Sequence, residues 1–370
     1  MNTLIRQDIA SLRPYEAHIV EGNIKLDANE NPFPWPDGMR EELFNFQYAF
    51  NRYPDSQTRM LREAIAAYNG VKAEEVLVGN GSDELIQVIL HTFGGEGRAL
   101  MIHPPTFGMY AAAASITSTS LVEVPLLEGI SLDLETMLKK CSENKRVKVI
   151  IICNPNNPTG TLFPREEILK IVKNTEALVV IDEAYAEFSG ETLLDQIIDY
   201  PNILIMRTFS KAFGMAALRL GYVIGNKELI TCLNKVRQPF NVNSFSQRAG
   251  IVALKYVSAY QTQIAAIKKE ILMLYNELHK FEELKVLPTR ANFILFRPQD
   301  PEYWAEGLSS RGFTIRSLGE LPGLGKSLRV SAGTPEENRA FLKIIKDIAK
   351  SNIETSPLKK ISRFNGMYGG

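Results

Sequence analysis

The chain has 370 residues, 45% of them hydrophobic, and its 42 lysines and arginines balance 42 aspartates and glutamates. A formal net charge of zero gives no basic excess for nucleic acid or an anionic membrane surface, and the apolar content excludes wholesale disorder. The three cysteines and four histidines show no metal-site or disulfide spacing, so we expect no metal. No apolar run approaches the roughly 18 residues of a membrane span, and we expect a soluble, cytoplasmic protein.

The N-terminal region is expected to be an arm without long periodic structure, up to residue 36. Helices are expected at 38–46 and 57–68, the second from the apolar spacing of Leu61, Ile65 and Tyr68. Residues 51–55 form a loop between them, because the residue before a proline is pushed out of the helical region.

Short apolar runs alternate with helical segments from residue 76 onward. Runs such as 149–153 and 177–181 are apolar throughout, as a sheet covered on both faces requires. The alternation predicts an α/β fold with a mainly parallel, doubly covered sheet, whose functional crevice lies beyond the C-terminal ends of the strands. Strands are expected at 76–78, 99–102, 121–124, 147–153, 178–181, 203–206 and 221–224, and helices at 83–93, 107–115, 132–141, 164–173 and 227–236.

The last third of the chain changes character to α+β and predicts a second, smaller domain. A long helical stretch from residue 244 to about 281, broken once, precedes strands at 291–296 and 327–330 and helices at 301–310 and 335–350. We predict a large domain at residues 40–270, a smaller domain made of 1–39 and 271–350, and a loosely ordered tail at 351–370.

Residues 76–85 have the pattern strand, glycine turn, helix N-terminus, which presents backbone N–H groups to an anion. Gly79 and Gly81 begin a dinucleotide fingerprint, but Glu84 stands where its third glycine belongs. The next strand ends in His103 rather than an acidic ribose ligand, so NAD is not expected. Taken alone, an ordinary helix cap at Ser82 explains the segment equally well.

Polar groups also follow three later strands. Asn157 lies in the rigid turn after 147–153, and Asp182 follows 177–181 at the edge of a buried sheet, where a carboxylate needs a partner. Lys211 follows the strand at 203–206 among apolar neighbours, which favour the free amine and make a lysine a usable nucleophile and base. A loop turn, a helix cap and a surface lysine are the simpler interpretations of these residues one by one.

Together these segments place an anion-binding turn, an amide, an acid with a tyrosine three residues on, and a lysine with an arginine at successive strand ends. That set fits pyridoxal 5'-phosphate. Its aldehyde needs a lysine for a Schiff base, its ring nitrogen needs an acid, and its phosphate needs a cationic or helix-terminal cradle.

The chain also carries specific motifs up to about residue 348. They are LDANENP at 26–32, RYPD at 52–55, GNGSDE at 79–84, PPTFGMY at 104–110, NPNNPTG at 154–160, DEAY at 182–185, SKAFGMAALRLGY at 210–222, PFNVNSFSQ at 239–247, ANFIL at 291–295 and LRVSAGT at 328–334. With these motifs in this order, the chain resembles the fold-type I pyridoxal-phosphate aminotransferases, and within them the histidinol-phosphate aminotransferase family.

The resemblance implies roles for the cofactor residues. Lys211 forms the Schiff base and moves a proton, and Asp182 pairs with the ring nitrogen. Asn157 and Tyr185 bond the phenolate oxygen of the ring, and Tyr110 stacks on its face. The phosphate is held by Gly81, Ser82, Ser210 and Arg219, with Asp83 included by motif alone.

The resemblance further implies the substrates histidinol phosphate and glutamate or 2-oxoglutarate. One guanidinium fork, Arg329, can bind a carboxylate or a phosphate in turn. Arg316 and Tyr15 are candidates for the substrate phosphate. Tyr53 is expected to reach the cofactor phosphate of a neighbouring subunit, which makes the expected active unit a homodimer.

Two alternative functions stay open, because such enzymes would share nearly every cofactor residue. They are an aromatic amino acid aminotransferase and a phosphothreonine decarboxylase. A regulator that kept the fold without turnover is disfavoured, because no DNA-binding appendage or basic patch accompanies the enzyme-length region.

Overall fold

The computed structural model describes residues 4–10, 12, 14 and 20–355, and a seven-stranded sheet forms its centre. The strands lie in the order β2-β8-β7-β6-β5-β3-β4. Neighbouring strands from β4 to β7 pair in parallel, whereas β8 is antiparallel to both β2 and β7. The expected mainly parallel sheet is therefore confirmed. Its strands are β2 (Val76–Gly79), β3 (Ala99–Ile102), β4 (Ser120–Glu123), β5 (Val147–Cys153), β6 (Leu178–Asp182), β7 (Ile203–Thr208) and β8 (Gly221–Gly225).

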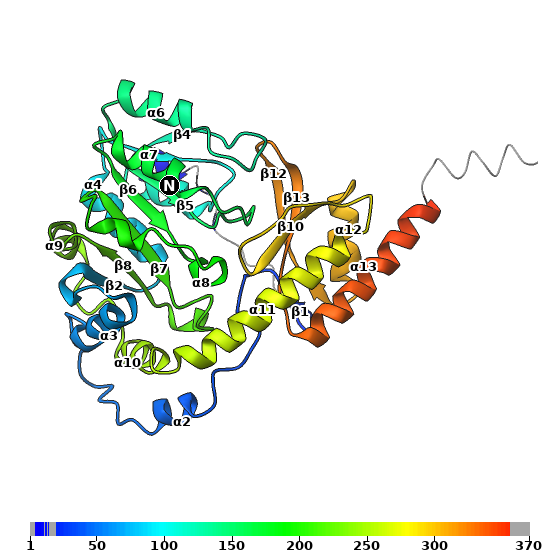
Figure 1. The fold of residues 1–370 in the computed structure, drawn as a ribbon, viewed down its shortest axis with the longest axis horizontal. Helices are drawn as coiled ribbons and strands as arrows, with labels where there is room; N and C mark the ends of the chain where they lie inside the picture. The colour runs from blue at the N-terminus through cyan, green and yellow to red at the C-terminus, as the bar shows by residue number, and fades with distance from the viewer. Residues whose placement is uncertain (1–3, 11, 13, 15–19, 356–370) are drawn as a thin grey trace, which may run out of the picture.

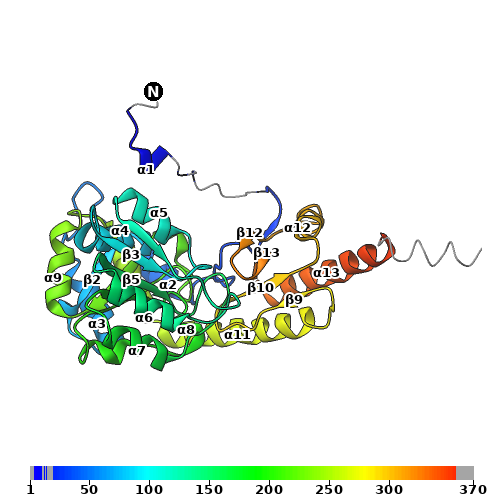
Figure 2. The ribbon, with the colours of Figure 1, turned by 90° about the horizontal axis from the view of Figure 1, so that it is seen from above.

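Helices cover both faces of this sheet, as Figure 2 shows. Side chains alternate across a strand, so Val149 and Ile151 pack in one core while Ile150 and Ile152 pack in the other. This two-sided burial is the reason why β5 is apolar from Val149 to Cys153. One core takes α4 (Ser82–Phe93), α5 (Met109–Ile116) and α9 (Lys227–Val236), and the other takes α3 (Arg59–Asn69), α6 (Leu134–Glu143) and α7 (Arg165–Lys173).

A four-stranded antiparallel sheet of order β12-β13-β10-β9 lies beside the large one (Figure 1). The long helices α11 and α13 pack together, and α11 reaches from the large sheet to the small one. The expected break in the helical stretch is confirmed, because α10 ends at Ala253 and α11 begins at Val257. These elements are β9 (Lys285–Val286), β10 (Phe293–Arg297), β12 (Arg316–Leu321), β13 (Gly325–Ser331), α10 (Ser244–Ala253), α11 (Val257–Leu278), α12 (Pro301–Ser309) and α13 (Pro335–Thr355).

The N-terminal arm lies beside the small sheet, where β1 (Ile24–Lys25) and β11 (Phe313–Thr314) pair in parallel as a separate two-stranded sheet. Short helices complete the described chain at α1 (Gln7–Ala10), α2 (Met39–Phe44) and α8 (Ala186–Ser189), with 3-10 turns at Ala73–Glu75, Leu194–Ile197 and Ala216–Leu218. No helix among the described residues is both long and apolar enough to cross a membrane.

Two of the differences from the sequence-based expectation concern the site and the tail. The strand β12 was not expected at all, although it lines the candidate site described below. Helix α13 continues to Thr355, so the tail expected from residue 351 begins in a helix, and its remainder lies outside the described residues. The expected domain boundary at residue 270 falls inside α11, and the division into two domains stays a prediction.

Candidate active site

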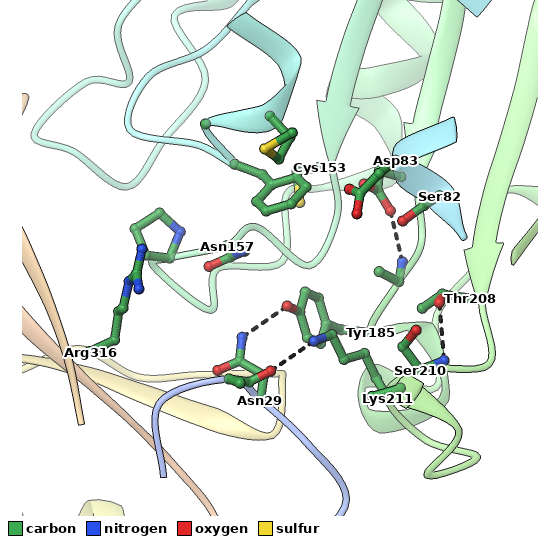
Figure 3. A pocket seen from close by; sticks show the side chains of 18 of the residues that line it. Asn29, Ser82, Asp83, Cys153, Asn157, Tyr185, Thr208, Ser210, Lys211 and Arg316 are labelled. Atoms are coloured by element: carbon green, nitrogen blue, oxygen red, sulfur yellow. Dashed lines mark hydrogen bonds between the residues drawn. The ribbon is translucent and has the colours of Figure 1, made fainter. Parts of the chain in front are cut away.

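A cavity of about 800 Å³ lies at the C-terminal ends of the parallel strands, between the large sheet and the small one. Its wall brings together residues that are far apart in the sequence. The large-sheet side contributes Ser82, Asp83, Asn157, Asp182, Tyr185, Ser210, Lys211 and Arg219, and the small sheet contributes Arg316 and Arg329. Figure 3 shows Arg316 entering from the small sheet, on the side opposite Ser82 and Asp83.

Lys211 lies just beyond the end of β7, where the chain turns after Thr208. Its Nζ is half-buried and donates a 2.8 Å hydrogen bond to the backbone oxygen of Ala28 in the N-terminal arm. Burial, assisted by the positive charge of Arg329, lowers the pKa of Lys211 to about 8. A substantial fraction of the amine is therefore neutral near physiological pH.

Asp182 ends β6 and is buried, with two donors on its carboxylate. Tyr110 Oη donates to Oδ2 at 2.5 Å, and the backbone N–H of Ala184 donates to Oδ1 at 3.1 Å. Loss of solvation raises the pKa of Asp182 to about 6, although both hydrogen bonds oppose this rise. The carboxylate is thus oriented, and none of the residues that the structure describes gives it a cationic partner.

The position of Tyr110 corrects the stacking role expected for it. Its side chain is fully buried behind the cavity wall, whereas Phe107 lines the cavity. The two rings meet edge to face with centroids 5.5 Å apart. Phe107 precedes the start of α5 at Met109, and Tyr110 lies in its first turn and points toward the sheet. The aromatic side chain that this segment brings to the cavity is therefore three positions earlier in the chain.

Arg329 on β13 is buried and connects the two sheets. Its Nη1 donates to Asn157 Oδ1 at 2.5 Å, and Nη2 donates to the backbone oxygen of Asp27 at 2.7 Å. The guanidinium also lies over the ring of Phe293, 5.3 Å from the centroid. This fork therefore holds Asn157, the N-terminal arm and the small sheet in one arrangement.

Asn29 is a cavity residue that we did not single out, although it lies within the LDANENP motif. Its Nδ2 donates to Tyr185 Oη at 2.9 Å, so the phenolic hydrogen of Tyr185 can point elsewhere. Asn29 has a positive φ of 54°, and Ser331 and Asn292 bond its backbone. The arm is therefore built into the wall of the cavity.

The N-terminus of α4 and Arg219 form a positively polarised corner. The N-cap Gly81 has φ 82° and provides no side chain to cap the helix. This left-handed φ favours glycine, and a Cβ on Gly81 would lie 2.8 Å from Arg219 Nη2, so the Arg219 side chain would have to shift. Arg219 Nη2 forms a 2.9 Å ion pair with Asp83, and both side chains are partly exposed. Asp83 thus balances the charge of Arg219.

Thr208 is a second residue that we had not singled out, and its Oγ1 accepts the backbone N–H of Ser210 at 3.0 Å. One expected residue lies apart from the cavity. Tyr53 is 82% exposed and stacks on Phe240 with ring centroids 4.6 Å apart. Tyr15 lies outside the described residues.

Comparison with known proteins agrees with this geometry. The family model described as aminotransferase class I and II matches residues 21–345. A histidinol-phosphate aminotransferase of Desulfitobacterium hafniense (strain Y51) is 52% identical over 94% of this chain and 97% of its own length. The solved histidinol-phosphate aminotransferase from Clostridium acetobutylicum is 28% identical, with a TM-score of 0.82 over 89% of this chain and 99% of that one.

The same enzyme from Sinorhizobium meliloti, solved in complex with pyridoxal-5'-phosphate, has a TM-score of 0.84 at 22% identity. The match covers 94% of this chain and 98% of the Sinorhizobium meliloti chain. At 22% identity it shows the shared fold alone.

Proposed function

The chain belongs to the class I and II aminotransferase family, and on that basis we propose that it interconverts histidinol phosphate plus 2-oxoglutarate and imidazole acetol phosphate plus glutamate. This reaction is a step of histidine biosynthesis. The observation that carries the proposal is that Lys211, Asp182 and Arg329 line one cavity in a chain 52% identical to a histidinol-phosphate aminotransferase.

The residues of the cavity fit pyridoxal 5'-phosphate, the cofactor of this enzyme. When bound, it supplies an electron-withdrawing ring that stabilises negative charge on the carbon bearing the amino group. Asp182 is a buried carboxylate that has no paired cation among the described residues, and a protonated ring nitrogen would provide one. The uncapped start of α4 and Arg219 provide an anion site for its phosphate.

Lys211 is the catalytic residue in this proposal. Its lowered pKa provides a neutral amine that can act as a nucleophile toward an aldehyde. Once the amine of the substrate has displaced it, the same nitrogen would be free in the cavity to accept a proton from one carbon and deliver it to another. Asn157 and Tyr185 are the hydrogen-bond partners we assign to the phenolate oxygen of the ring.

Gly81, Ser82, Ser210 and Arg219 are the residues we assign to the cofactor phosphate. Asp83 belongs to this group through its ion pair with Arg219 rather than as a ligand. Without a bound phosphate, the ion pair with Asp83 keeps Arg219 at the cavity. When the phosphate dianion binds, it competes with Asp83 for the guanidinium.

The substrate end combines charge with an apolar wall. Arg329 can exchange its bonds to Asn157 and Asp27 for a bidentate oxyanion. Arg316 lies beside it in the β12–β13 register and is assigned, with Tyr15, to the substrate phosphate. Leu318 and Leu321 on β12 give the same cavity an apolar side that suits an imidazole ring.

The active unit in this proposal is a homodimer. The support is an exposed apolar surface near Tyr53, with Phe50 74% and Met60 65% exposed, because large exposed apolar side chains that cluster mark interaction sites. Tyr53 of each subunit then serves the cofactor phosphate of the other. The cytoplasm remains the expected location.

A competition assay tests the substrate. Histidinol phosphate, phenylalanine and tyrosine are offered together as amino donors to 2-oxoglutarate, and we expect histidinol phosphate to be consumed first. A preference for phenylalanine would overturn the substrate and leave the cofactor site intact. Conversion of the bound cofactor to its amine form by glutamate alone, followed by absorbance, separates a transferase from a decarboxylase.

A further inference from the structure

The tip of the β12–β13 hairpin, residues 322–324, rests on the loop at residues 126–131 that follows β4 (Figure 1). The side chain of Leu324 lies directly over Gly129. A Cβ on Gly129 would overlap Leu324 Cγ and lie 2.8 Å from Leu324 Cδ2. From the other side, a Cβ on Gly323 would lie 2.7 Å from the backbone nitrogen of Gly129. The two backbones therefore meet at a pair of glycines.

Gly129 is buried between two exposed neighbours, Glu128 and Ile130. Because Gly129 has no side chain, the hairpin tip can pack against its backbone. Its φ of 77° and that of Gly323, 73°, are both values that favour glycine. Shape as well as backbone conformation thus selects glycine on each side of the contact.

Both partners in this contact are held from behind. Arg297 Nη1 donates to the backbone oxygen of Leu324 at 2.6 Å, which ties the tip to β10. The loop closes on itself through the pairing of Leu127 with Ser131, and the N–H of Leu126 donates to Pro104 at 2.7 Å. Pro104 begins the segment that carries Phe107 to the cavity, so the contact joins two walls of the same site.

We propose that Gly129, Gly323 and Leu324 are positioning residues that hold β12 over the active site and so shape the substrate wall made by Arg316, Leu318 and Leu321. This inference rests on the proposed function for the identity of the substrate, but the contact itself does not. It goes beyond the assigned residues, because none of the three lines the cavity.

The position of the contact predicts which step it serves. Leu321 pairs with Gly325 at the tip end of the hairpin, whereas Arg316 pairs with Arg329 at its base. Along β13, Gly325 and Arg329 are about 13 Å apart at ~3.3 Å per residue. Arg329 is additionally held by β10 through its register with Leu295. Loosening the tip therefore disturbs the wall near Leu318 and Leu321 while the oxyanion fork and the cofactor cradle keep their supports.

Gly129→Ala and Leu324→Ala test the contact from its two sides in the holoenzyme. For histidinol phosphate we expect KM to rise about tenfold in each variant, because a wall displaced by ~1 Å misplaces the substrate. The KM for glutamate and the absorbance of the bound cofactor should stay near those of the unmodified enzyme. Hydrogen exchange of the amides in residues 316–326 should become faster. Leu324→Met, which conserves volume, should restore both measurements.

Gly97→Ala is the matched control, since Gly97 has φ 78° but nothing within 4 Å of its Cβ position. It reproduces the backbone strain of Gly129→Ala without the clash. If Gly129→Ala and Leu324→Ala match Gly97→Ala in both exchange and KM, the proposal is wrong. Faster exchange with an unchanged KM also overturns it, because the tip would then be held without positioning substrate. If the unmodified enzyme does not use histidinol phosphate as an amino donor, the proposed function is wrong. The KM values of the variants are then compared using the aromatic donor that the enzyme does accept.

Discussion

The hydroxyl of Tyr110 donates a 2.5 Å hydrogen bond to Asp182, and both side chains are buried. The bond joins the first turn of α5 to the end of β6, so one helix outside the sheet fixes the orientation of the carboxylate. A carboxylate that must meet a ring nitrogen at one angle benefits from such a fixed donor, because less reorganisation is needed on binding. Tyr110 therefore acts through Asp182, and Phe107 provides the aromatic surface of the cavity.

Tyr110→Phe removes this donor and keeps the ring. We expect cofactor affinity to fall by about tenfold, since a hydrogen bond to a charged group contributes roughly 1.5–3 kcal/mol and part is recovered by relaxation. The hydrogen bond lowers the pKa of Asp182, so its loss should also move the titration of that carboxyl above pH 6. Cofactor release followed by absorbance measures the first effect.

Tyr260→Phe is the control for this prediction. Tyr260 is equally buried, and its hydroxyl contacts Met39 Sδ at 3.1 Å, away from the residues that line the cavity. Equal loss of cofactor affinity in both variants would mean that general loosening, rather than the orientation of Asp182, explains the result.

Lys211→Ala removes the only amine among the cavity-lining residues that the structure describes. Turnover should fall below detection, because neither the nucleophile nor the proton carrier remains. The absorbance typical of the covalently held cofactor should disappear with it. Lys227→Ala, at an exposed lysine paired with Glu74, should keep full activity. Normal turnover of the Lys211 variant would refute the chemistry proposed for this residue.

The lowered pKa of Lys211 predicts a pH dependence of stability in the cofactor-free protein. Between its folded pKa of about 8 and the ordinary value of 10.5, the unfolded chain holds a proton that the folded chain does not. Stability therefore rises with pH across this window, relative to Lys211→Met, which has no amine. Urea unfolding at pH 8 and pH 10 measures the free energy of unfolding of the unmodified protein minus that of Lys211→Met, with Lys227→Met as the control. A decrease in this quantity from pH 8 to pH 10 contradicts the expectation.

Much of the large sheet could be predicted because its strands are buried on both faces. The strand expected at 147–153 is apolar throughout from residue 149 to 153, and β5 has the expected bounds. Lys211 and Asp182 could then be placed near each other, since the ends of parallel strands share one edge of a sheet. The strand β12 could not be predicted this way, because Ser317, Gly319 and Glu320 interrupt any apolar run and most of its residues are exposed or half-buried.

The sequence could not predict which aromatic residue of the motif at 104–110 lines the cavity, for a different reason. Phe107 and Tyr110 belong to one motif, and which ring meets the cavity depends on where α5 begins. Asn29 is similar, because only the path of the arm against β13 brings it to Tyr185. Motifs identify segments, whereas packing between distant segments decides which side chain of each segment faces the site.

The exposed Tyr53 leads to a prediction about two subunits. If Tyr53 serves the cofactor phosphate of the neighbouring subunit, Tyr53→Ala and Lys211→Ala fail at different sites of a mixed dimer. The site with an intact Lys211 then receives an intact Tyr53 from the other subunit. Co-refolding equal amounts should recover about a quarter of normal activity, because half of the dimers formed by chance are mixed and each holds one working site.

Two measurements decide this prediction. The activity of the mixture must exceed the sum of the separate variants; if Tyr53 acted within its own subunit, no site in the mixed dimer would be complete and nothing would be regained. Sedimentation of Phe50→Ser tests the surface itself, which should lose assembly when an aromatic side chain that is 74% exposed in one subunit is removed. Ile198→Ser, at an 86% exposed side chain elsewhere, should sediment as the unmodified protein does, because loss of surface apolar area alone does not dissociate a dimer.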